Sequence, residues 1–209
     1  IRDVERSRGL GDVYKRQVFG ERHIYVQGDL ATDDCRYALP DSASPNNVVG
    51  QDLAEQLVGL CYQKGMPHLV VKEDEHFRFG PGERVWSRTA LIVGVEWGGS
   101  ALALRFSILQ EKLPFFVSKS VLKTLGGVLD MGTNEITFKR LGNATEPLFE
   151  LDSDHIGITL YKEDEDPPRL SQITLDLCAD GAAVALEKQK HRNGLHTLTR
   201  KGVPHAVDL

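Results

Sequence analysis

Short apolar segments with alternating side chains do most to limit the folds open to this chain. Leu91, Val93 and Val95 fall at every second position, and the run Ala101–Leu109 repeats the pattern after Gly98-Gly99. A period of two is typical of a β-strand with one face against a core, and a glycine pair is typical of a tight hairpin turn. The pattern therefore predicts antiparallel β-structure.

Further short apolar segments predict more strands, at residues 24–26, 37–39, 69–71, 77–79, 135–139, 148–151 and 156–161. Many short strands at regular spacing favour an all-β barrel or sandwich. One segment differs, because Gln51–Lys64 carries leucines at helical spacing between Gly50 and Gly65. It predicts an amphipathic helix of about three turns. The charged segment Lys72–His76 is predicted to be a turn.

Composition is that of an ordinary globular protein, with 209 residues, 41% hydrophobic and 26% charged. This length allows one domain with tails, or two small domains. The formal net charge of −5 argues against a chain that clamps nucleic acid as a whole. No apolar run approaches the roughly 18 residues of a membrane span, and no signal peptide is visible. No membrane partner is expected.

Three cysteines, Cys35, Cys61 and Cys178, are scattered without a CxxC spacing. Such a set fits reduced thiols better than a disulfide framework, so an intracellular and cytoplasmic location is expected. His68 and His76 lie near acidic residues, but their spacing fits no standard metal site, and exposed turn residues are the favoured interpretation. No metal and no cofactor is predicted.

Both ends of the chain differ from its middle. Ile1–Gln17 resembles translated adapter sequence; the alternative is a natural charged leader. Residues 18–161 form the predicted domain. The charge run Lys162–Arg169 is predicted to be a linker, and the rest of 162–209 a poorly ordered tail in which Ala182–Leu186 indicates a helix turn. The basic run Lys188–Arg192 could touch RNA, but a solvated tail is favoured.

One candidate for chemistry is Asp41, which follows a short apolar run and precedes the turn Ser42-Ala43-Ser44-Pro45. A carboxylate at the tip of such a turn can share one proton with a second carboxylate, and the pair then activates water for peptide hydrolysis. The alternative stays open that Asp41 is a turn residue that bonds its own backbone.

The order of the features that follow strengthens the first interpretation. An apolar hairpin over residues 76–97 has Gly80-Pro81-Gly82 at its tip, although an ordinary hairpin turn would look the same. Leu113–Met131 then predicts a buried strand, a short helix and another strand. Turn, hairpin and strand–helix–strand together resemble a retroviral-type (retropepsin-like) aspartic protease subunit, of the kind found in retrotransposon polyproteins. The resemblance covers roughly residues 20–160.

This resemblance implies a closed β-barrel with a flap hairpin, one additional amphipathic helix and one short C-terminal helix. It implies an aspartic endopeptidase whose second carboxylate comes from another copy of the chain, since Asp152-Ser153-Asp154 lacks the small third residue. Asp41, Ser42 and Ala43 would form the catalytic turn, with the Ser42 hydroxyl bonded to the partner subunit. The flap would use Phe79, Gly80, Pro81 and Gly82, and Val117 and Ser118 would support the turn from beneath.

Four residues depart from the family's pattern around the predicted site: Pro40, Ala43, Pro45 and Ser118. A second hypothesis is therefore a catalytically degenerate relative that serves in dimerisation or peptide binding. A third is a β-barrel that binds nucleic acid, which the negative charge and the few aromatic residues disfavour. The expected partners are a peptide or polyprotein substrate and a second copy of the chain.

Overall fold

The computed structural model describes residues 34–78, 84–151, 155–163 and 165–187, and the backbone of 196–198 and 204–206. This part of the chain is mostly β, as the alternating segments predict. The predicted flap tip at residues 79–82, the segment Asp152-Ser153-Asp154, the segment Ile1–Gln17 and the basic run at 188–192 lie outside the described residues.

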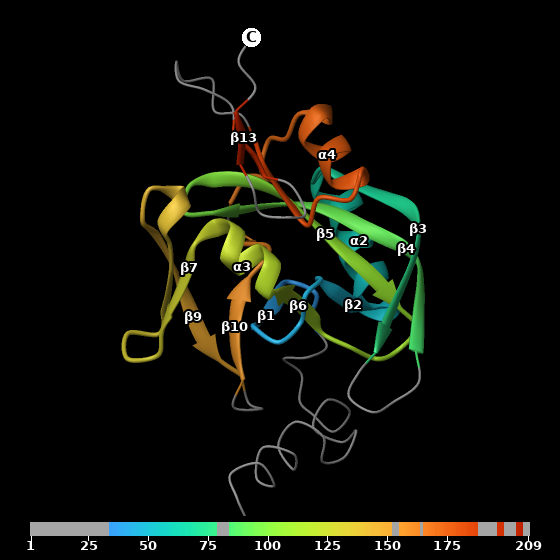
Figure 1. Ribbon diagram of the computed structural model, residues 1–209, viewed down its shortest axis with the longest axis horizontal. Helices are drawn as coiled ribbons and strands as arrows, with labels where there is room; N and C mark the ends of the chain where they lie inside the picture. The colour runs from blue at the N-terminus through green and yellow to red at the C-terminus, as the bar shows by residue number, and fades with distance from the viewer. Residues whose placement is uncertain are drawn as a thin grey trace, which may run out of the picture.

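One sheet of eleven strands dominates the described structure (Figure 1). Its strand order is β3 (His68–Arg78), β4 (Arg84–Trp97), β5 (Ser100–Leu109), β2 (Val48–Gly50), β6 (Phe115–Ser118), β1 (Tyr37–Asp41), β10 (Ile156–Thr159), β9 (Ala144–Glu150), β8 (Glu135–Phe138) and β7 (Gly127–Asp130), while β11 (Val184–Leu186) pairs with β5. The other elements are α2 (Gln51–Lys64), α3 (Lys119–Leu125), α4 (Gln172–Ala179), the 3-10 turn η2 (Lys139–Leu141) and the pair β12 (His196–Leu198) with β13 (Pro204–Ala206). No helix of the described residues is long and apolar enough to cross a membrane.

Helix α2 has the predicted bounds. Its apolar stripe buries Leu53, Leu57 and Cys61, and the helix ends at Gly65, whose φ of 68° is the left-handed conformation that glycine adopts at little cost. Because glycine brackets the segment and the apolar spacing is helical, local sequence is sufficient to specify this element.

Gly50 is the site of a prediction about stability. Gly50→Ala is expected to lower the free energy of unfolding by about 1–3 kcal/mol, since overpacking of this kind costs that much. A Cβ there would lie 2.5 Å from the Glu111 carbonyl oxygen and 2.6 Å from the Leu113 nitrogen, both of them backbone atoms. Gly59→Ala within α2 is the matched control, because among the described residues no atom beyond its chain neighbours and the helix backbone lies within 4 Å of its Cβ position.

The control variant is expected to gain about 0.5–1 kcal/mol, because alanine is the better helix former. Urea denaturation of both variants and of the unmodified chain measures the difference. A loss of stability at Gly59 as large as that at Gly50 would contradict the steric explanation.

The predicted charged turn at Lys72–His76 is wrong, because β3 runs through it without a break. Alternate residues of this stretch, Lys72, Asp74 and His76, point to solvent, as expected for a strand at the end of the sheet. The register shifts between Lys72 and Glu75, so that Glu73 and Asp74 both stand opposite Arg88. This irregularity is a β-bulge, which a run of charges does not reveal.

The expectation of a poorly ordered tail fails for residues 171–187. Ser171 caps α4 by accepting a hydrogen bond from the Thr174 N–H, and the helix buries Leu175 and Cys178 against β4 and β5. The predicted helix turn at Ala182–Leu186 is wrong, because Val184–Leu186 forms β11 and pairs with β5. The segment is ordered because its apolar side chains pack on the sheet, where Leu175 and Cys178 join a cluster with Ile92 and Ala103.

Candidate active site

The candidate loop, residues 41–47, begins at Asp41, where β1 and β6 end side by side. These strands are parallel, and their register places Asp41 opposite Ser118. The chain then returns as β2, which pairs antiparallel with β6 and parallel with β5. Parallel pairing of two strands that are far apart in sequence brings their carboxyl ends together at one edge. Asp41, Val117 and Ser118 are thereby brought together.

The carboxylate of Asp41 uses only one of its oxygens within the loop. Oδ1 accepts hydrogen bonds from the Ala43 N–H at 2.8 Å and the Ser44 N–H at 3.2 Å. Among the described residues no donor contacts Oδ2. Asp41 is half-buried, and Ser42 and Ala43 are exposed. One oxygen is therefore fixed by the backbone, while the other is available to water or to a second carboxylate.

Asp130 provides an internal comparison. Its Oδ1 accepts from the Gly132 N–H at 2.8 Å and the Thr133 N–H at 3.2 Å, the same geometry as at Asp41. Asp130 ends β7, which lies at the end of the sheet, whereas Asp41 ends β1 between β6 and β10. The hydrogen bonds of an Asx turn alone thus do not distinguish a catalytic aspartate from a turn aspartate. The two aspartates differ in position, because Asp41 ends an interior strand and Asp130 ends a strand at the end of the sheet.

Backbone contacts with α3 hold the candidate loop in place. The Lys119 N–H donates to the Ser44 carbonyl oxygen at 2.9 Å, and the Ser120 hydroxyl donates to the Pro45 carbonyl oxygen. Ser44 also donates from Oγ to the Asn46 carbonyl oxygen at 2.6 Å. Since the bonds from Lys119 and Ser120 join the loop to the first residues of the helix, the position of Asp41 depends on the position of α3.

Ser118 has a structural reason to be serine. It is fully buried and caps α3, with Oγ accepting from the Val121 N–H at 3.4 Å. Pro40, another departure from the family's pattern, lies opposite Val117, and the pairing of β1 with β10 covers only Tyr37 and Ala38. The strand therefore accommodates proline beyond its paired segment with β10.

Asn47 is a residue of the site that the sequence analysis missed. Its side chain is buried, and its Oδ1 accepts from the Ser118 N–H at 2.7 Å. Its Nδ2 donates to the Arg105 carbonyl oxygen at 2.8 Å and to the Ala183 carbonyl oxygen at 3.3 Å. The amide thus ties the candidate loop to β6, β5 and the segment before β11. In sequence, Pro45-Asn46-Asn47 has only the composition of a turn, so no local signal marks it.

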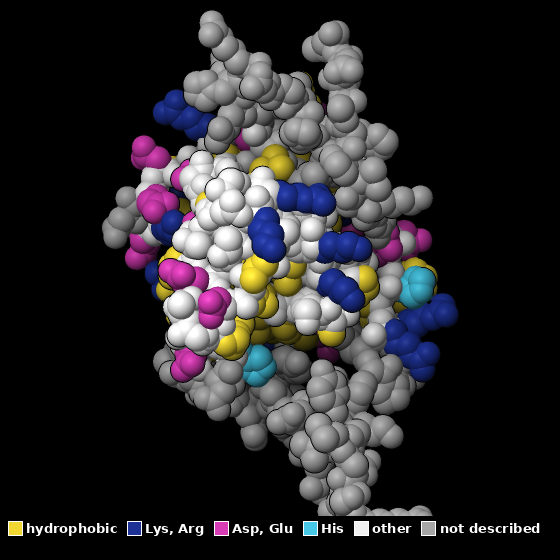
Figure 2. Space-filling model, turned by 60° about the vertical axis from the view of Figure 1, so that its left-hand side comes forward, with side chains coloured by type: hydrophobic (Ala, Val, Ile, Leu, Met, Phe, Trp, Pro, Cys, Tyr) yellow, Lys and Arg dark blue, Asp and Glu magenta, His cyan; other side chains and the backbone are white. Residues whose placement is uncertain are grey.

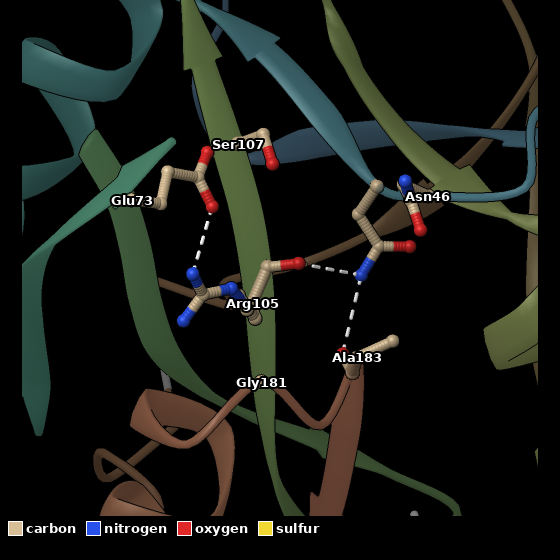
Figure 3. A pocket seen from close by; sticks show the side chains of 7 residues that line it. Asn46, Glu73, Arg105, Ser107, Gly181 and Ala183 are labelled. Atoms are coloured by element: carbon tan, nitrogen blue, oxygen red, sulfur yellow. Dashed lines mark hydrogen bonds and ion pairs between the residues drawn. The ribbon is translucent and has the colours of Figure 1, made fainter. Parts of the chain in front are cut away.

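Glu73 is a second residue for which the prediction is wrong, because the sequence analysis assigns it to a charged turn. Its side chain is 3% exposed and its Oε2 lies 2.7 Å from the Nη2 of Arg105. Figure 3 shows this ion pair beside a small pocket, with Asn46, Ser107, Gly181 and Ala183 around it. The pocket lies next to the Asn47 amide and so adjoins the candidate site.

The histidines and cysteines do not form a second chemical centre in the described residues. His68 contacts the Met66 carbonyl oxygen, and His76 packs against Trp86. No group of three or more His, Cys, Asp or Glu side chains in the described ranges could hold a metal ion. Burial raises the pKa of the Cys61 and Cys178 thiols to about 12. These buried thiols stay protonated near neutral pH and are poor nucleophiles.

Exposed cations gather on α3, whose first residues contact the candidate loop, and on the adjoining η2. Lys119 and Lys123 on α3 and Lys139 and Arg140 on η2 are exposed, and the Lys139 N–H donates to the carbonyl oxygen of Gly126, the residue that ends α3, at 3.2 Å. Figure 2 shows Lys and Arg side chains grouped near the centre of one face. These basic side chains are grouped although the formal net charge of the chain is −5.

The chain matches no protein-family model and no curated protein. The functional argument therefore depends on the geometry of the chain itself.

Proposed function

We propose that this chain is an aspartic endopeptidase domain of a retroelement-type polyprotein, active as a homodimer. One observation carries the proposal: Asp41 ends an interior strand opposite Ser118, on a loop anchored to α3, with one carboxylate oxygen left without a donor among the described residues. The arrangement supports a carboxylate that is held rigidly and presented outward. A retropepsin-like protease subunit, which the segment Leu113–Met131 resembles, would hold its catalytic aspartate in this way.

Hydrolysis would require Asp41 from each of two subunits at hydrogen-bonding distance. Two carboxylates that close do not both ionise, because the like charges repel, so the pair shares one proton. The ionised member takes a proton from water as the water attacks the scissile carbonyl carbon. The neutral member donates its proton to the carbonyl oxygen, which becomes the hydroxyl of the tetrahedral intermediate.

The remaining parts of the proposal follow from the resemblance. The β3–β4 hairpin would carry the flap, with Phe79, Gly80, Pro81 and Gly82 at its tip, and would close a barrel over an extended peptide substrate. The exposed Ser42 would contact the partner subunit. The length of β3 and β4, eleven and fourteen residues, supports a hairpin that projects beyond its neighbours.

Dependence of activity on protein concentration tests this proposal. Unfolded protein substrates and peptide libraries would be offered at mildly acidic pH, while sedimentation measures the fraction of dimer. Specific activity is expected to rise with concentration and to level off once dimers dominate, because one chain supplies only one carboxylate. Cleavage by a pure monomer, or none by a folded dimer, would contradict the proposal.

A second candidate function is a degenerate relative that binds peptides or dimerises without catalysis. One observation favours this candidate. Asp130 accepts the same two backbone hydrogen bonds as Asp41, and there they stabilise only a turn. A folded dimer that binds extended peptides and leaves them intact would support this alternative.

A further inference from the structure

The carboxylate of Glu73 has one oxygen that no group of the described residues satisfies. Oε2 pairs with Arg105, but Oε1 is buried and has no hydrogen-bond partner in the described residues. A buried acceptor without a partner is costly, and native proteins usually satisfy it with another group or with an ordered water. This atom is therefore evidence for an additional molecule.

The pocket beside Glu73 has the size and the lining for that molecule. Its volume is about 20 Å³, which is room for one water. Glu73, Ser107 and Asn46 contribute polar side chains to its wall. The opposite charges of Glu73 and Arg105 balance, so a neutral hydrogen-bond donor fits better than a metal ion.

We propose that this pocket binds one water molecule, which donates to Glu73 Oε1 and completes a buried polar network that positions the candidate catalytic loop. The network starts on the flap hairpin, because Glu73 belongs to the β3 bulge. It reaches Arg105 on β5, and the two side chains are separated by 32 residues in sequence. The water and the ion pair thereby join β3 to the centre of the sheet.

From Arg105 the network divides into two branches. In the first branch, the Nη1 of Arg105 donates to the Cys178 carbonyl oxygen at 2.9 Å and to the Ala179 carbonyl oxygen at 3.2 Å. These bonds hold the C-terminal end of α4 against β5. In the second branch, the backbone oxygen of Arg105 accepts from Asn47 Nδ2 at 2.8 Å. The Ala183 carbonyl oxygen joins the branches, since it accepts from both the Arg105 N–H and Asn47.

Asn47 then connects the network to the candidate site. Its Oδ1 accepts from the Ser118 N–H, directly opposite Asp41 in the register of β1 and β6. Glu73 and Arg105 are thus positioning residues, which act through Asn47 and do not touch substrate. The catalytic part of this inference rests on the proposed function, whereas the water and the coupling to Ser118 do not.

Amide hydrogen exchange of the full chain tests the coupling without any need for activity. Glu73→Gln removes the charge that holds Arg105, and exchange at Ser118 is expected to quicken about tenfold relative to core amides of β4 and β5. Asp74→Asn is the matched control, because it removes the same charge from an adjacent residue whose ion pair with Arg88 is exposed. Unchanged exchange at Ser118 in Glu73→Gln, or an equal change in Asp74→Asn, would overturn the coupling.

A crystal structure of the unmodified chain tests the water whether or not the variants fold. Density for one water within hydrogen-bonding distance of Glu73 Oε1 is expected. An empty pocket, or a Glu73 side chain turned to solvent, would overturn the proposal.

Where cleavage is detected, Glu73→Gln is expected to lower kcat about tenfold with little change in KM, and Asp74→Asn is expected to change neither kcat nor KM. Loss of stability without this split would leave Glu73 a structural residue only and contradict its positioning role.

Discussion

Asp41→Asn is expected to lower kcat/KM by about a hundredfold to ten-thousandfold, the range that general acid–base catalysis contributes. Asparagine retains the side-chain oxygen that accepts from the Ala43 and Ser44 N–H groups, so the turn is expected to keep its form. The amide neither ionises nor shares a proton, so it cannot activate water. Cleavage of a peptide substrate and urea denaturation, measured together, separate the loss of chemistry from a loss of folding.

Asp130→Asn is the control for this experiment, because Asp130 makes the same two hydrogen bonds at the end of β7. It is expected to leave cleavage unchanged. Mixing the unmodified chain with an excess of Asp41→Asn is expected to suppress activity, since a mixed dimer holds one carboxylate. Activity that survives in Asp41→Asn would remove Asp41 from the mechanism.

Trp97→Ala is expected to lower the free energy of unfolding by about 3–5 kcal/mol, the usual cost of truncating a buried large aromatic side chain. Trp97 is fully buried, and its ring stacks on Phe138 with centroids 5.3 Å apart. Its Nε1 donates to the Thr159 carbonyl oxygen at 2.8 Å. One side chain thus joins β4, β8 and β10, three strands that are not neighbours in the sheet.

Trp86→Ala is the matched control, because it removes the same side chain from an exposed part of the β3–β4 hairpin. Trp86 is 45% exposed and contacts His76 and Arg88. A loss below about 1 kcal/mol is expected there, as for most surface substitutions. Midpoints of urea denaturation give both values. Comparable losses at the two positions would show that Trp97 does not join the two parts of the sheet.

Local sequence was sufficient for α2, β4 and β5, since each has its periodicity within one continuous segment. Local sequence was not sufficient at residues 72–76, where a run of charged residues predicts a turn but belongs to β3 at the end of the sheet. It failed again at Val184–Leu186, which is a strand because β5 offers it a partner. In both places contacts with distant residues overrode the local preference.

At the candidate site, residue patterns alone predict an aspartate at the end of an apolar strand, followed by a turn, with a strand and a short helix further on. The parallel pairing of β1 with β6, which puts Asp41 opposite Ser118, and the Asn47 side chain that bonds to Ser118 become visible only in the folded chain. The same holds for the ion pair of Glu73 with Arg105. Periodicity and turn chemistry act between near neighbours in the chain, whereas strand order and buried polar pairs depend on contacts between distant segments.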